Sequence, residues 1–73
     1  MDHLDIDPMK IKTWKELRAD PRVAEVWSED DDGVEYWVVL NAPWKTADGL
    51  STIHEWSQSA CIRELNLAVS SAT

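Results

Sequence analysis

The residues best suited to covalent or acid–base chemistry in this chain are two histidines, His3 and His54, and a single cysteine, Cys61. A thiol beside an imidazole can act as nucleophile and base, so a small enzyme that uses His54 and Cys61 is one hypothesis. Cys61 belongs to the apolar stripe of a predicted helix, where a free cysteine is typically a small core residue. His54 is more typical of a structural hydrogen-bonding or surface residue. We therefore expect no catalytic residue and no enzyme activity.

Residues that hold metals or cofactors are also sparse. Zinc sites need about four Cys or His ligands at close spacings, and this chain has three such residues far apart. The stretches Asp5–Asp7 and Asp30–Asp32 are rich in oxygen ligands, but neither has the twelve-residue pattern of a calcium loop. The two glycines, Gly33 and Gly49, form no phosphate-binding loop. We expect no metal site and no cofactor.

Carboxylates are the one type of functional group that clusters in a short segment of this sequence. The chain has 14 acidic and 7 basic residues, a net charge of −7 at pH 7, and the acids and bases of residues 1–22 cancel. Six acids fall within one short segment: Glu25, Glu29, Asp30, Asp31, Asp32 and Glu35. A surface of this sign argues against direct binding to nucleic acid or to an anionic membrane. It indicates either a basic partner or a solvated hairpin tip that keeps the protein soluble.

The first element expected to position these groups is a short helix. Thr13 and Glu16 have the spacing of a capping box, and Trp14 and Leu17 follow at helical spacing. Asp20-Pro21 ends the helix, because a residue that precedes proline avoids the α region. Residues 1–12 are interpreted as an N-terminal tail.

An antiparallel hairpin is expected next, with strands at 23–28 and 34–40 and the acidic segment 28–33 between them. Asp32-Gly33 is a favoured hairpin dipeptide. Side chains alternate along a strand, so Tyr36 and Val38 share one face with Val34 and Leu40, while Glu35, Trp37 and Val39 share the other. Trp27 is expected to lie near Trp37 on that second face.

The aromatic content suggests an interaction surface. Five tryptophans are too many for a small core to bury completely: Trp14, Trp27, Trp37, Trp44 and Trp56. Aromatic anchors with charged residues at the rim are typical of protein interfaces. We therefore interpret Trp37, and Trp44 in the loop 41–49, as partner-binding residues beside the six carboxylates. The alternative is that the tryptophans of the hairpin pack under the N-terminal helix.

The remainder of the chain predicts a third strand and a second helix. Residues 50–55 fit a short strand, although Thr52 and Glu55 would also suit the start of a helix. From Ser57 onward an apolar stripe runs to Val69. The predicted fold class is α+β: a short N-terminal helix, an antiparallel hairpin with a short third strand, and a C-terminal helix packed on the sheet. One compact domain is expected over 13–69, with 70–73 frayed.

Several short motifs resemble a pattern found in small phage and prophage proteins. They are Trp14, Asp20-Pro21-Arg22-Val23, Asp32-Gly33, Tyr36-Trp37-Val38, Asp48-Gly49 and Thr52-Ile53-His54-Glu55. The similarity spans about Trp14 to Leu65, and this sequence has Ala42-Pro43-Trp44 where the pattern has glycine before tryptophan. Some small acidic proteins of this type are anti-CRISPR inhibitors, which implies a CRISPR effector as partner. No catalytic motif comes with the resemblance.

Two functional hypotheses follow. In the first, the protein is an acidic, non-enzymatic inhibitor whose carboxylates take the place of phosphates on the basic surface of a nucleic-acid-binding protein. In the second, it is a generic interaction module that works through a Trp-bearing sheet face, as a monomer or homodimer. One cysteine allows no internal disulfide, which suits the bacterial cytoplasm. No apolar run approaches the ~20 residues of a membrane span.

Overall fold

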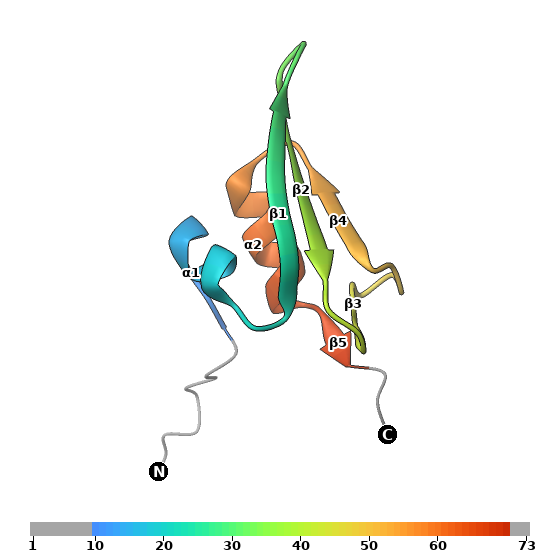
Figure 1. Cartoon of the computed structure of the whole chain (residues 1–73). Helices are drawn as coiled ribbons and strands as arrows, with labels where there is room; N and C mark the ends of the chain where they lie inside the picture. Colours follow the sequence, from blue (N-terminus) through green and yellow to red (C-terminus); the bar gives the residue numbers. More distant parts are fainter. Residues whose placement is uncertain (1–9, 71–73) are drawn as a thin grey trace.

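The computed structural model describes residues 10–70, and these form the predicted α+β arrangement (Figure 1). Helix α1 spans Trp14–Ala19 and begins with the expected capping box: the Thr13 hydroxyl accepts from the Glu16 backbone, and the Glu16 carboxylate accepts from the backbone of Thr13. It stops at Asp20, whose extended backbone precedes Pro21. Burial of Leu17 then fixes this short helix on the rest of the molecule.

Three antiparallel strands form the main sheet in the order β1-β2-β4: β1 (Val23–Asp30), β2 (Val34–Leu40) and β4 (Thr52–Glu55). The hairpin is as expected, but β1 runs two residues beyond Ser28. Because Glu29 pairs with Glu35 and Asp30 with Val34, the turn itself is only 31–33. Gly33 has a φ of +147°, which side-chain-bearing residues rarely adopt. The third strand is confirmed, and no helix begins at Thr52.

Both helices cover the same face of this sheet (Figure 1). Helix α2 spans Gln58–Asn66 and begins at Ser57, whose hydroxyl accepts from the Ala60 backbone. The core lies between the helices and the sheet, as the alternation of β2 predicts. It consists of Ile11, Leu17, Val38, Leu40, Ile53, Cys61 and Leu65. The opposite face of the sheet has no helix over it within residues 10–70.

The two ends of the folded part differ from the sequence interpretation. Ile11, assigned to the tail, is buried, and its backbone N–H and C=O both bond the Asn66 side chain at 2.9 Å. Helix α2 ends at Asn66, so the prediction that Val69 continues its stripe is wrong. Val69 lies in β5 (Val69–Ser70), which pairs with β3 (Trp44–Lys45) inside the predicted loop. Residues 1–9 and 71–73, parts of the predicted tail and frayed end, lie outside the described residues.

A buried ion pair between Arg22 and Asp20 lies on the helix side of the sheet, at the end of the molecule opposite the hairpin tip. The Arg22 guanidinium donates to both carboxylate oxygens of Asp20, at 2.9 Å from Nε and 2.8 Å from Nη2, and to the Leu65 carbonyl from Nη1 at 3.0 Å. It also lies over the Trp44 ring, 5.5 Å from the centroid. Hydrogen bonds from Arg22 hold the pKa of Asp20 below its usual value. Arg22 thus ties the end of α1 to the end of α2.

Candidate functional site

The acidic hairpin is the most exposed part of the predicted site. It extends beyond the helices at one end of the molecule (Figure 1). Its strand and turn residues Glu29, Asp30, Asp31 and Asp32 are all exposed, and so is Glu25 nearer the base of β1. Among residues 10–70, none of these five carboxylates forms an ion pair. The hairpin therefore displays uncompensated negative charge on a hydrogen-bonded ladder.

Glu35, the sixth predicted carboxylate, has a partner in the chain. Its Oε1 lies 2.7 Å from Nε2 of His54, and both side chains are partly exposed. Strand register explains the contact, because Glu35 precedes Trp37 on the same face of β2 by two residues and His54 pairs with Trp37. Glu35 therefore differs from the carboxylates of the hairpin tip, because a histidine side chain lies within hydrogen-bond distance of it.

A row of stacked rings crosses the uncovered face of the sheet. Trp27, Trp37 and His54 are directly opposite one another on β1, β2 and β4. The ring centroids are 5.9 Å apart for the two tryptophans and 3.8 Å apart for Trp37 and His54, with interplanar angles of 7° and 8°. Trp56 continues the row 5.7 Å from His54. The expectation that Trp27 lies near Trp37 is confirmed.

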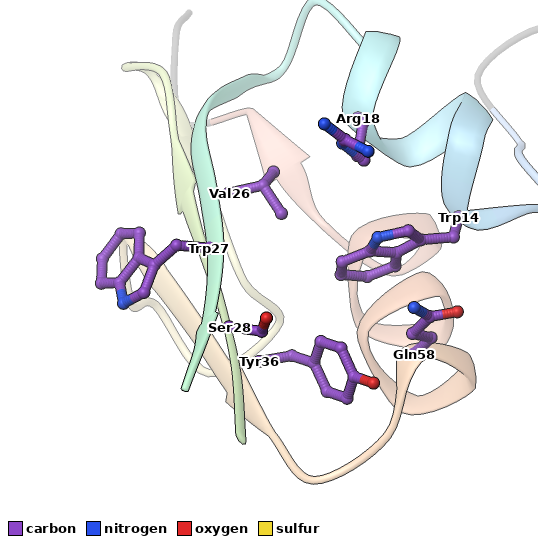
Figure 2. Close-up of a pocket in the computed structure, with 7 residues that line it drawn as sticks. All are labelled: Trp14, Arg18, Val26, Trp27, Ser28, Tyr36 and Gln58. Carbon is purple, nitrogen blue, oxygen red and sulfur yellow. The ribbon is translucent and has the colours of Figure 1, made fainter. Parts of the chain in front are cut away.

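The alternative in which these two tryptophans pack under the N-terminal helix does not hold. Figure 2 shows the Trp27 ring on the side of β1 away from both helices, whereas Val26 and Tyr36 point toward them. Trp27 is 40% exposed and Trp56 is 65% exposed. The indole N–H of Trp37 is enclosed and has no acceptor among the described residues. The row is a partly open aromatic surface rather than core.

Trp14 occupies the other side of the sheet. Its ring meets Tyr36 edge to face, with centroids 5.2 Å apart, beside a pocket between α1, the hairpin and the start of α2 (Figure 2). Arg18, Ser28 and Gln58 complete the polar lining of this pocket. The lining of this pocket includes no cysteine, histidine or carboxylate side chain.

Trp44, the other predicted anchor, does not join the aromatic row. It lies in β3 at the end of the molecule opposite the hairpin tip, where it packs against the core and under Arg22 (Figure 1). The structure therefore brings Trp37 together with Glu35, and places the charged tip on the same hairpin, but it separates Trp44 from all of them.

The two residues considered for covalent chemistry lie on opposite faces of the sheet. Cys61 is completely buried on the helix side, and burial raises its pKa to about 11, assisted by the negative charges of Glu55 and Glu64. His54 projects from the uncovered face against Trp37. A thiol and an imidazole separated in this way cannot form a nucleophile–base pair. Within the described range, no three Cys, His, Asp or Glu side chains gather as metal ligands.

Sequence reasoning missed the role of His54 and Trp56 in this surface. The signal was present, since His54 alternates with Ile53 just as Trp37 alternates with Val38, but the register of β4 was unknown. A related feature was also missed: β1, β2 and β4 contain five carboxylates and no lysine or arginine. All seven lysines and arginines lie outside the three strands.

Comparison with known proteins gives no match to a family model and no significant similarity to a curated protein or a solved structure. None of the helices in residues 10–70 has the length and apolar character needed to cross a membrane. Functional inference for this chain therefore depends on the geometry of its surfaces.

Proposed function

We propose that this chain is a non-enzymatic inhibitor protein that binds the basic surface of a nucleic-acid-binding protein. In this proposal, the carboxylates of its hairpin occupy positions that the partner otherwise uses for phosphates. The observation that carries it is the display of Glu29, Asp30, Asp31 and Asp32, exposed and without an ion pair within residues 10–70, on a projecting hairpin.

Electrostatics favours this proposal over a purely solubilising role. Adjacent like charges repel and oppose folding, and in water a cationic partner relieves that repulsion. The ladder of β1 and β2 holds the side chains of Glu29 and Asp30 in a defined register, and 31–33 form a tight turn, so the charges face a partner with little ordering cost on binding. Opposite charges also accelerate association, and salt weakens that effect.

The resemblance of the segment from Trp14 to Leu65 to small phage proteins suggests the class of partner. Under this proposal the partner belongs to a bacterial defence complex, such as a CRISPR effector, and binding blocks its nucleic-acid site. The protein then acts in the bacterial cytoplasm, and it contacts no nucleic acid itself.

A capture experiment with charge-matched variants tests the proposal. The variant D30N/D31N/D32N removes three carboxylates from the hairpin. The control D48N/E55Q/E64Q removes three from a separate region that lines another pocket near Ile53. Both variants have the same net charge, so a difference between them reports position rather than total charge.

The immobilised proteins are exposed to bacterial lysate at about 50 mM and about 500 mM salt, with and without duplex DNA. We expect wild type and control to retain a nucleic-acid-binding protein that high salt and DNA both release, and the hairpin variant to retain about tenfold less. Equal capture by the two variants, or capture that DNA does not displace, would contradict the proposal.

A second candidate is a generic interaction module or self-associating protein that uses the uncovered sheet face. The specific observation in its favour is the exposed row formed by Trp27, Trp37, His54 and Trp56. Sedimentation of the free protein separates the candidates, because self-association through this face predicts a dimer that Trp37→Ala dissociates.

A further inference from the structure

The uncovered face of the sheet combines aromatic rings with one sign of charge. Glu25 and Glu29 flank Trp27 on the same face of β1, each two residues away and therefore about 7 Å along the strand. Both carboxylates are exposed. β1, β2 and β4 contain no lysine or arginine, so the sheet's own strands offer these two carboxylates neither a guanidinium nor an ammonium group.

Trp27 is 40% exposed, and within residues 10–70 only one face of its ring is stacked on another ring. It belongs to β1, an edge strand of the sheet, so it ends the stacked row. One face of its indole lies against Trp37, and among residues 10–70 no other ring stacks on the opposite face. An open indole face between two carboxylates is suited to a planar cation, since the ring attracts positive charge and the carboxylates accept hydrogen bonds.

The same combination of tryptophan, carboxylate and guanidinium occurs within the chain, at the end of the molecule opposite the hairpin tip. There the guanidinium of Arg22 lies 5.5 Å from the Trp44 centroid and donates two hydrogen bonds to Asp20. The tryptophan and the carboxylate are thus both satisfied by one arginine from within the chain. At Trp27 the tryptophan and carboxylates are present, but the sheet supplies no guanidinium.

We propose that the face of β1 formed by Trp27, Glu25 and Glu29 binds an arginine side chain of the partner protein. This inference rests on the proposed function, because the basic partner of the hairpin supplies the arginine. The guanidinium stacks on the open face of Trp27 and donates to Glu25 or Glu29. Arginine is favoured over lysine because it is planar and can stack and pair at the same time. A second copy of this chain fits less well, since its own face would bring Glu25, Glu29 and Glu35 against the same residues.

The test uses two peptides of equal length and charge, one in which arginine alternates with glycine and one with lysine in its place. Each is titrated into ¹⁵N-labelled protein, and the five indole N–H resonances are followed. We expect the arginine peptide to shift the Trp27 resonance most and to bind about fivefold more tightly than the lysine peptide. Trp27→Leu removes this preference, while Trp56→Leu, which removes the most exposed tryptophan from the far end of the row, retains it.

Equal affinity for the two peptides, or a preference that survives Trp27→Leu in a folded variant, would overturn the inference. So would a shift of the Trp27 resonance with protein concentration alone, which would identify a second copy as the occupant. The hairpin variant D30N/D31N/D32N separates this test from the preceding one, because we expect it to weaken both peptides equally and leave the arginine preference intact. Loss of partner capture by that variant, together with equal peptide affinities, would leave the proposed function standing and this inference refuted.

Discussion

The two faces of the sheet are built from the same three strands, yet they differ in almost every physical property. The face under the helices presents Val38 and Ile53 to Leu17 and Leu65, and all four are buried. The uncovered face carries the exposed side chains of Trp27 and His54 with the half-buried Trp37 between them, and carboxylates lie beside this row. In a domain this small, apolar burial on one face supplies most of the stability. The other face has no helix over it within residues 10–70.

Acidic and basic residues are also distributed unevenly among the elements. Among their charged residues β1, β2 and β4 have acids but no lysine or arginine, and all seven lysines and arginines lie outside these three strands. Each face also has a side-chain pair: the Arg22–Asp20 ion pair is buried on the helix side, while the hydrogen-bonded pair His54–Glu35 is partly exposed on the other. The Arg22–Asp20 pair therefore contributes to the packed side of the fold, whereas the His54–Glu35 pair remains accessible to solvent.

The largest expected effect concerns these two side-chain pairs. Asp20→Ala leaves the buried Arg22 guanidinium without its carboxylate and should destabilise the protein by about 3–5 kcal/mol. Glu35→Ala breaks the partly exposed pair and should cost less than about 1 kcal/mol. Urea unfolding followed by circular dichroism measures both, and similar losses would contradict the division between the faces.

A second pair of variants replaces one large apolar side chain on each side of the sheet. Leu65→Ala creates a cavity in the core and should cost about 2–5 kcal/mol, enough to unfold much of a protein of this size at room temperature. Trp27→Leu keeps an apolar group at a 40% exposed position and should change the free energy of unfolding by about 1 kcal/mol or less. If Trp27→Leu proves as damaging, the row is part of the core and not a surface for recognition.

Thiol reactivity provides a chemical probe of the same division. The pKa of Cys61, raised to about 11, and its complete burial should make labelling by a disulfide reagent at pH 8 roughly a hundredfold slower in the native state than in urea. The double variant T52C/C61S moves the cysteine to a half-buried position on the uncovered face and should react much faster than native Cys61. Rapid labelling of native Cys61 would show that the helix layer opens readily.

The smallest expected effect is the response to acid. Hydrogen bonds from Arg22 lower the pKa of Asp20 in the folded state, so this carboxylate contributes stability above its unfolded pKa of about 4 and loses it as the pH falls through the lower, folded value. Backbone N–H groups of Lys12 and Thr13 lower the pKa of Glu16 in the same direction. Melting temperature should therefore be flat from about pH 7 to 5 and fall below about pH 4, less steeply in a Glu16→Gln variant.

Local patterns in the sequence predicted the elements that depend on nearby residues. The capping box at Thr13 and Glu16, the alternation in β2 and the start of α2 at Ser57 all follow from spacings of a few residues. The pairing of β3 with β5 was not predictable in this way. It joins residues about 25 apart, and neither two-residue strand has an alternating pattern to read.

The candidate site was predictable only in part for the same reason. The carboxylates are visible as a run, and Trp37 as an outward residue of β2. Their relation to His54 depends on how β4 pairs with β2, and the separation of Trp44 depends on its pairing with Ser70. Both relations are long-range, so spacing along the chain does not reveal them.

The most direct test of the proposed binding by the hairpin carboxylates is the rate at which the captured partner associates with this protein. Steering by the hairpin carboxylates predicts that the association rate constant falls at least about tenfold between about 50 mM and about 500 mM salt. It also predicts that D30N/D31N/D32N associates slowly at both salt concentrations, while D48N/E55Q/E64Q behaves like wild type. An association rate for the hairpin variant equal to that of wild type, with the same salt dependence, would contradict the account.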